Sequence, residues 1–358
     1  MRRILRDAGG ALLFPLIAIF LAFVIGAVLV LASGNNPVTA YVALAQGAVG
    51  SPVAIGRTLL NATPLIFTGL AVAVAFRAGL FNIGGEGQVY IGAITGAIVA
   101  VYLTTLGPVA IPLVLISCLI TGFMWGAIPG FLKARFGAHE VITTIMLNFI
   151  AINLATYLAL GPFRSEEIVP GTQTIEAVMR LPLVGFGLSR VHYGLFVGLL
   201  AALAVYLLLW RTKLGFRIRA VGLSPGAASY AGMGIGRNTV LALAIGGAMA
   251  GLGGGAEVLG VYGKVSIPFV ANLGFNGIGV ALLGRNHPVG VVLGALLFGG
   301  LASGAQQMQF DTDVPLDLAD VLLAVILLLV TATKLVEFII GKRARSLATV
   351  TRLDEGVS

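Results

Sequence analysis

Long, nearly uninterrupted apolar segments are the feature that most limits how this chain of 358 residues can fold. Hydrophobic residues fill 58% of its positions and charged residues only 10%, against roughly 45–50% and 25% in soluble domains. Lipid leaves only helices or closed barrels able to satisfy the backbone, and continuous apolar segments exclude a barrel. We therefore predict an all-α polytopic membrane protein.

About ten segments are candidates for membrane-spanning helices, which need about 20 apolar residues each. They lie near 11–32, 58–76, 86–106, 109–131, 141–160, 192–210, 239–262, 270–284, 289–306 and 318–340. The eighth is short, and glycines interrupt the chain before the third. We expect broken or short helices near 77–90 and 270–284. The 50 glycines fit close packing between membrane helices.

The distribution of charge predicts the orientation. Basic residues cluster at both chain ends and after the fourth, sixth and eighth segments, so all of them share one side if both termini are cytoplasmic. The loop near 161–190 carries acidic residues and is then external, either as a solvated loop or as a short helix. We expect one transmembrane domain over 1–345 and a cytoplasmic tail over 346–358.

Several functional classes have no support in the sequence. Cys118 is the only cysteine, and the three histidines lack metal-ligand spacing, so we expect no metal site. No G-x-x-x-x-G-K-[ST] phosphate cradle and no catalytic motif is present. The net charge of +8 follows from topology and does not indicate nucleic-acid binding. If transport is driven by ATP, another chain binds the nucleotide.

A basic stretch over 210–240 contains the signals of a short helix. Ser224 is a plausible N-cap, Pro225 suits the first turn and Gly232 can end the helix, which predicts about two turns near 224–232. Such a helix suits a groove on a soluble partner, although a loop with basic topogenic residues is the alternative. The residues we expect at this contact are Arg217, Arg219, Ser224, Pro225, Ala227, Ala228, Ala231 and Gly232.

Three glutamates, Glu86, Glu140 and Glu257, fall in or beside apolar segments, where an ionisable group is by default a functional hypothesis. Helical spacing places Glu86 on one face with Tyr90 and small residues, and Glu140 on another with Asn148, and both faces belong toward the bundle interior. The side chains could line a solute pathway, join helices by hydrogen bonds, or lie at the membrane interface.

Two similar segments, GLFNIGG (79–85) and LGFNGIG (273–279), place Phe-Asn among glycines beside interrupted apolar segments. Related breaks in two halves of a chain are typical of transporter pathways. With glycine this abundant, chance explains the similarity equally well.

The segments FNIGGEGQVYIGAITGA (81–97), FRIRAVGLSPGAASYAGM (216–233) and ALLGRNHPVGVVLGALLFG (281–299) resemble membrane permease subunits of bacterial ABC importers. The resemblance covers about 55–340. More narrowly, the chain resembles the nucleoside and simple-sugar branch of the branched-chain amino acid and ribose permease superfamily. It implies a non-enzymatic subunit in the bacterial inner membrane that uses 216–233 as a coupling helix.

The resemblance also implies a set of partners: a second permease, which is a different homologous chain, two cytoplasmic ATPases or a fused tandem ATPase that binds ATP and Mg, and an external solute-binding lipoprotein. The chain itself then needs no cofactor. A pathway for a nucleoside or sugar would use amides and aromatic rings. The residues we expect along it are Phe81, Asn82, Glu86, Gln88, Tyr90, Asn148, Asn153, Glu257, Asn276 and Gln306.

The main rival is a secondary transporter driven by an ion gradient through Glu86, Glu140 or Glu257, for which broken helices are also suitable. A passive pore is disfavoured because the sequence has no charged ring or filter-like repeat.

Overall fold

The computed structural model describes residues 20–185, 191–267, 269, 272–315 and 317–331. Within these ranges the chain is helical apart from turns, loops and isolated β-bridges. The helices are Phe20–Ala32, α2 (Pro37–Val49), α3 (Pro52–Arg77), α4 (Gly85–Tyr102), η1 (Thr104–Ala110), α5 (Ile111–Phe136), α6 (Glu140–Leu160), η2 (Ala177–Met179), α7 (Gly194–Arg211), α8 (Lys213–Leu223), α9 (Pro225–Tyr230), α10 (Ile235–Glu257), η3 (Val258–Tyr262), α11 (Leu273–Leu283), α12 (Pro288–Thr312) and α13 (Asp317–Thr331).

The protein is a multi-pass membrane protein, as the apolar segments predicted. Among the described residues, 6 helical segments are long and apolar enough to span a bilayer, and three apolar helices of 10–17 residues accompany them. The total of about ten spans and the cytoplasmic position of both termini stay predictions. The tail over 346–358 lies outside the described residues. No predicted segment covers α2, so the sequence missed this helix.

Two compact units make up the chain, one of residues 42–307 and one of 1–41 with 308–358. In the smaller unit the Tyr41 hydroxyl donates a hydrogen bond to the Phe23 carbonyl at 2.5 Å, and the two rings lie edge to face. The side chain of Leu322 in α13 occupies the space beside Gly26. The single-domain organisation stays a prediction.

The larger unit is built around α3 and α10, whose apolar stretches are each 78% buried, whereas that of α6 is only 22% buried. Glycines allow α10 to reach this central position. A Cβ on Gly92 of α4 would lie 2.0 Å from the Gly251 carbonyl, and one on Gly122 of α5 would lie 2.3 Å from the Gly247 carbonyl. The helix backbones therefore touch directly, as small residues permit in membrane bundles.

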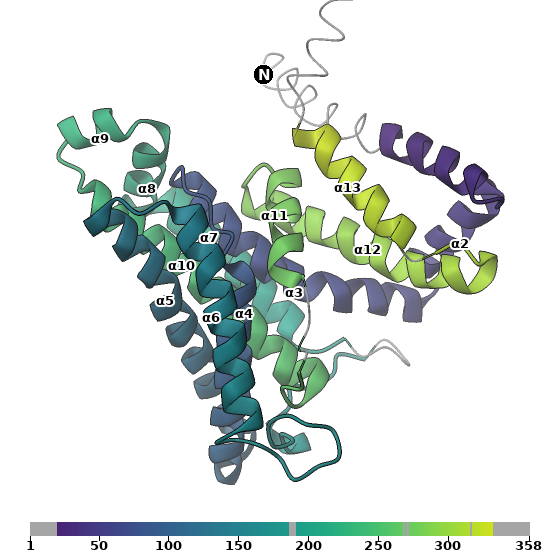
Figure 1. The fold of residues 1–358 in the computed structure, drawn as a ribbon, viewed down its shortest axis with the longest axis horizontal. Helices are drawn as coiled ribbons and strands as arrows, with labels where there is room; N and C mark the ends of the chain where they lie inside the picture. Colours follow the sequence, from purple (N-terminus) through teal and green to yellow (C-terminus); the bar gives the residue numbers. More distant parts are fainter. Residues whose placement is uncertain (1–19, 186–190, 268, 270–271, 316, 332–358) are drawn as a thin grey trace, which may run out of the picture. The chain divides into compact units, whose positions relative to one another are not determined.

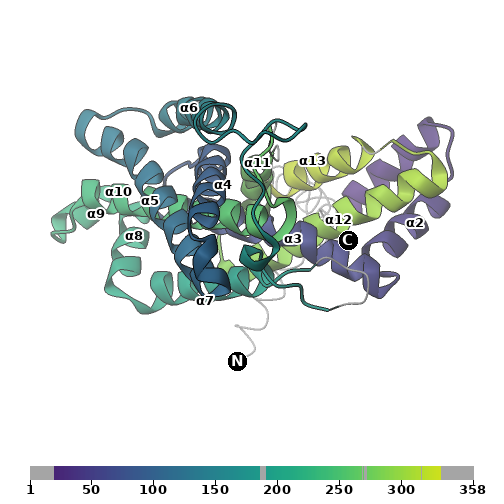
Figure 2. The ribbon, with the colours of Figure 1, turned by 90° about the horizontal axis from the view of Figure 1, so that it is seen from below.

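The larger unit has two distinct ends. Helices α8 and α9 lie at one, which we call the basic end because it carries Arg77, Arg217 and Arg219 (Figure 1). The loop over 161–185 lies at the other, and Figure 2 shows this unit from a second direction. Helix α11 is only 11 residues long, about 16 Å, roughly half the thickness of a bilayer core. The prediction of a short helix near 270–284 is confirmed over its described residues.

Candidate functional site

The chain is non-helical between the end of α3 at Arg77 and the start of α4 at Gly85, which confirms the predicted break near 77–90. The buried amides of Asn82 and Gln88 hold this connection by hydrogen bonds in both directions, at 3.1 and 3.3 Å. The Asn82 Oδ1 atom also accepts from the Gly84 amide at 3.1 Å. Both side chains therefore stabilise the break.

Helix α4 has no side-chain cap of its own at Gly84, and α6 supplies one. The Oδ1 atom of Asn148 accepts a hydrogen bond from the Gly87 amide at 2.8 Å, and its Nδ2 atom donates to the Ile83 carbonyl at 2.9 Å. The first of these bonds satisfies an N–H group that a helix start leaves without a partner, and the second holds the residue just before the helix. The predicted inward faces, Glu86 with Tyr90 and Glu140 with Asn148, are buried.

Glu86 caps a second helix start. Its Oε1 atom accepts from the Asn272 amide at 2.9 Å and its Oε2 atom from the Gly274 amide at 2.7 Å, both at the beginning of α11. Asn272 has the left-handed φ of 68° and makes no side-chain cap, so the carboxyl group from α4 takes that place. The similar segments 79–85 and 273–279 thus lie against each other.

A cavity of about 200 Å³ lies where α3, η3, α11 and α12 meet. Its polar lining includes two residues predicted for the pathway, Glu257 and Asn276, brought together from different helices. Glu257 is only 4% exposed, and its Oε1 atom has no hydrogen-bond partner among the described residues. The full lining is Leu60, Asn61, Pro64, Leu65, Glu257, Val261, Tyr262, Leu273, Asn276 and Ala302.

Two irregular helical segments border this cavity. The turn that follows Glu257, η3, is a π-helix, and such turns are frequent at functional sites. Pro64 lies inside α3 and has no N–H to donate to the Leu60 carbonyl. Three aromatic rings follow one another from the end of η3. The centre of the Tyr262 ring lies 5.2 Å from that of Phe269, and the Phe269 ring lies 5.7 Å from that of Tyr90.

The other predicted pathway residues are not brought to this cavity. Phe81 is exposed and its ring contacts Phe76 at 5.0 Å. Asn153 is exposed and donates to the Phe149 carbonyl within α6. Gln306 is exposed on α12. Glu140, a candidate for ion coupling, forms an ion pair with Lys133 at 2.5 Å.

Two residues of the cavity, Asn61 and Tyr262, are not among those predicted from the sequence. Asn61 is a polar residue three positions before a proline inside an apolar segment, and that intramembrane position is the signal that could have identified it. Tyr262 had no such signal, because its place depends on the π-helical turn.

The predicted short helix near 224–232 is present as α9. Ser224 is its N-cap, with the Oγ atom 3.4 Å from the Ala227 amide, and Pro225 occupies the first turn. Gly232 has a φ of 75°, and the next amide bonds back to the Ala228 carbonyl, which ends the helix in a Schellman motif. The local prediction is confirmed.

The exposed surface of α9 differs in one detail from the expected contact set. Ala228 is buried, whereas Ala227 and Ala231 are exposed. The large apolar side chains of Leu223 and Tyr230 flank the helix and are 88% and 95% exposed. An apolar surface of this kind is suited to contact with another molecule.

Helix α8 connects α9 to the bundle by a direct backbone contact. A Cβ on Gly222 would lie 2.2 Å from the Arg77 carbonyl, so only glycine fits against the end of α3. The guanidinium carbons of Arg77 and Arg219 lie 5.2 and 5.6 Å from the centre of the Trp210 ring. Arg219, expected at the partner contact, is thus packed on Trp210, while Arg217 is exposed.

At the opposite end the loop over 161–185 is attached to the segment that follows η3. The Thr172 amide donates to the Val265 carbonyl at 2.9 Å. The exposed Glu167 forms an ion pair with Lys264 at 2.6 Å, and this contact holds the pKa of Glu167 below its usual value.

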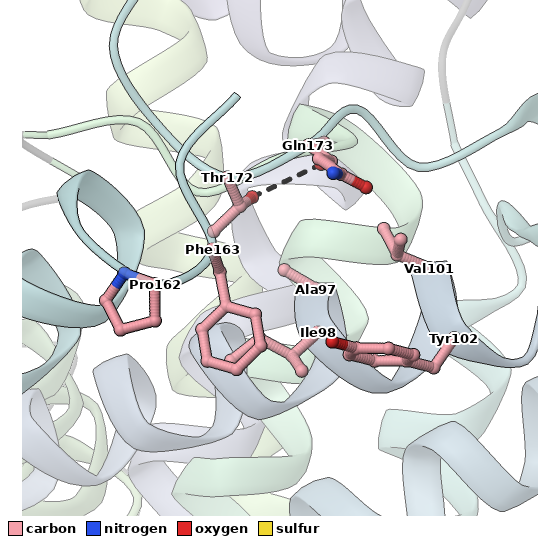
Figure 3. Close-up of a pocket in the computed structure, with 8 residues that line it drawn as sticks. All are labelled: Ala97, Ile98, Val101, Tyr102, Pro162, Phe163, Thr172 and Gln173. Carbon is pink, nitrogen blue, oxygen red and sulfur yellow. Dashed lines mark hydrogen bonds between the residues drawn. The ribbon is translucent and has the colours of Figure 1, made fainter. Parts of the chain in front are cut away.

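Beneath the loop lies a second cavity of about 160 Å³ (Figure 3). It is lined by Ala97, Ile98, Val101, Tyr102, Pro162, Phe163, Thr172 and Gln173.

His192 is buried in this loop region, just before α7. Its Nδ1 atom accepts from the Gly194 amide at 3.1 Å, and its Nε2 atom has no hydrogen-bond partner among the described residues. Burial lowers its pKa to about 4, so the imidazole is neutral at physiological pH.

Comparison with known proteins identifies clear relatives. A family model described as branched-chain amino acid transport system / permease component matches residues 54–331. The guanosine ABC transporter permease protein NupP of Bacillus subtilis is 41% identical over 334 residues, covering 92% of this chain and 96% of the relative. The nucleoside ABC transporter permease protein NupB of Lactococcus lactis is 37% identical, covering 92% and 93%.

Other matches extend this group. The glucose ABC transporter permease protein TsgB13 of Haloferax volcanii is 35% identical, with 89% of this chain and 87% of the relative covered. A second guanosine ABC transporter permease protein of Bacillus subtilis, NupQ, is 29% identical over 70% of this chain and 80% of its own length. No solved structure matches the chain.

Proposed function

Because this chain belongs to the family of branched-chain amino acid transport system permease components, we propose that it is the membrane permease of an ATP-driven importer for a nucleoside or simple sugar. The relatives that support this solute class are named as guanosine, nucleoside and glucose ABC transporter permeases. Their ABC class favours ATP over an ion gradient as the energy source. The host membrane is then the bacterial plasma membrane.

The observation that carries ATP coupling is the geometry of α9. Its N-cap, proline and terminating glycine fix a short rigid helix at the basic end, with Leu223 and Tyr230 exposed on either side. A helix of this kind fits a groove on a soluble protein. The nucleotide-binding partner is a pair of ATPase subunits or one tandem ATPase, which bind ATP and Mg.

A second, homologous permease completes the proposed membrane assembly. Bacillus subtilis has two guanosine ABC transporter permease proteins, NupP and NupQ, and both resemble this chain at different levels of identity. That difference favours a partner with a distinct sequence over a second copy. An external solute-binding lipoprotein would deliver the solute at the end that carries the loop over 161–185.

The contacts of α8 and α9 supply a route from α9 to the cavity. Gly222 packs against the backbone at Arg77, the last residue of α3. The chain then passes through the break, which the hydrogen bonds between Asn82 and Gln88 hold, and Glu86 lies between these two residues in the sequence. Glu86 holds the start of α11, and Asn276 in the next turn of that helix lines the cavity. A displacement of α9 by an ATPase would therefore move α11, a short helix whose start is held by Glu86.

Co-purification with the ATPase tests the docking assignment. An aspartate in place of the exposed Ala231 should abolish ATPase capture from membranes while insertion of the permease stays normal. Ala228→Asp is unsuitable because that side chain is buried. Ile168→Asp, which alters a fully exposed residue of the opposite loop, is the matched control and should capture the ATPase normally. Undiminished capture by the Ala231 variant would refute the assignment.

A further inference from the structure

We infer that Glu257, Asn61 and Asn276 form a binding site for the hydroxyl groups of a sugar ring, and that this site recognises the ribose of a nucleoside, not its base. This inference rests on the proposed function and specifies which part of the solute the permease contacts. Neither the relatives nor the family assignment identifies such a site.

Glu257 is the residue that most needs a ligand. Its side chain is at the end of α10 and is almost completely buried, yet Oε1 has no hydrogen-bond partner among the described residues. Leaving a buried carboxyl oxygen unpaired is costly, because the water it gave up on burial is not replaced by another donor. By contrast, both oxygens of Glu86 bond backbone amides. Glu257 therefore brings an acceptor oxygen without a partner to the wall of the cavity that it lines.

Amide groups on two other helices complete the polar lining. Asn61 comes from α3 and Asn276 from α11, and each amide can both donate and accept. The Leu60 carbonyl is a further acceptor on this side, because Pro64 cannot donate the usual helical hydrogen bond to it. Adjacent hydroxyls of a sugar are donors and acceptors at once, so they match a carboxyl group flanked by two amides.

The apolar part of the lining suits a sugar ring, which has polar hydroxyl groups at its edge and an apolar C–H face. Leu65, Pro64 and Leu273 form an apolar wall against which the C–H face of a sugar can pack. The cavity of about 200 Å³ is smaller than the roughly 300–1,000 Å³ of sites that enclose drug-sized ligands. A pentose is therefore a better match than a whole nucleoside, and the base remains outside the polar cluster.

Uptake of ribose and deoxyribose nucleosides separates this site from other roles of Glu257. The assay uses proteoliposomes with the complete transporter, ATP inside, and binding protein saturated with either guanosine or 2′-deoxyguanosine, so that its own selectivity does not contribute. Glu257→Gln and Asn276→Ala should each slow guanosine uptake several-fold, the effect of one lost or weakened hydrogen bond, and slow deoxyguanosine uptake less than twofold. Gln46→Ala, which removes an exposed amide of α2, is the control and should change neither rate.

The outcomes distinguish the two proposals. If the wild-type transporter moves guanosine and the variants lose the difference between the two solutes, the hydroxyl site is supported. If the variants slow both solutes by the same factor, or slow neither, the hydroxyl site is refuted while the proposed function stands. If the wild-type protein with ATP and a competent ATPase moves neither nucleoside nor any simple sugar, the proposed function itself fails.

Discussion

The Oε2 atom of Glu86 lies 2.7 Å from the backbone nitrogen of Gly274, and this hydrogen bond joins the first turn of α4 to the first turn of α11. The contact is possible only because position 274 is glycine. A Cβ there would lie 2.0 Å from the Glu86 amide nitrogen. A carboxyl group at the start of a helix also interacts favourably with its dipole, typically by 0.3–1 kcal/mol and up to about 2 when partly buried. Glu86 thus fixes where the short helix begins.

Replacing Glu86 by glutamine should lower stability, because the amide offers one acceptor oxygen where the carboxyl group offers two. One of the amides of Asn272 and Gly274 then loses its partner, at a cost of about 1–3 kcal/mol. Heating the detergent-solubilised protein and measuring the folded fraction by gel filtration checks this. Glu166→Gln, at an exposed loop residue, should not differ from wild type. Equal melting of the Glu86 variant and wild type would contradict the capping role.

Gly222→Ala tests the contact between α8 and the end of α3. The added methyl group would overlap the Arg77 carbonyl and the Ala78 backbone, neither of which can move independently, so we expect a loss of about 1–3 kcal/mol or more. Gly226→Ala in α9 is the matched control, because open space surrounds that position and alanine favours helix. Thermal unfolding in detergent should separate the two variants. A Gly222 variant as stable as the control would show that α8 is not packed against the end of α3 as described.

His192 predicts a pH dependence of stability. The folded protein holds this imidazole neutral down to a pKa of about 4, while an unfolded histidine titrates near 6.5, so the unfolded state binds more protons between these values. The contribution of His192 to the free energy of unfolding is therefore fully present above pH 6.5 and is lost as the pH falls toward 4. The loss amounts to about 3 kcal/mol. His192→Gln should remove that part of the slope, as shown by melting curves of variant and wild type from pH 7.5 to 4.5. Identical slopes would exclude His192 as a cause.

The sequence predicts local structure well where single residues determine it. Ser224, Pro225 and Gly232 determine where α9 begins and ends, and the apolar segments locate most of the long helices. Helix α2 was missed because its sequence, PVTAYVALAQGAV, is short and mixes polar with apolar residues. Its helical form depends on neighbours that composition does not reveal.

The candidate site was predicted only in part, because it depends on contacts between distant segments. Intramembrane charge identified Glu86 and Glu257 equally, yet the structure gives them different surroundings: two backbone amides for Glu86, and an unpaired oxygen beside a cavity for Glu257. Spacing along one helix cannot show which carboxyl group meets a helix start on another. Asn61 joined the site only once α3 and α11 were placed side by side.

The most direct test of the central claim is uptake into proteoliposomes that contain this permease, its partner permease and their ATPase, with loaded binding protein outside and all ion gradients collapsed. The account predicts nucleoside or sugar accumulation that requires ATP and stops when the ATPase is omitted or cannot hydrolyse nucleotide. Uptake that proceeds without ATP and follows an imposed proton or sodium gradient would contradict it.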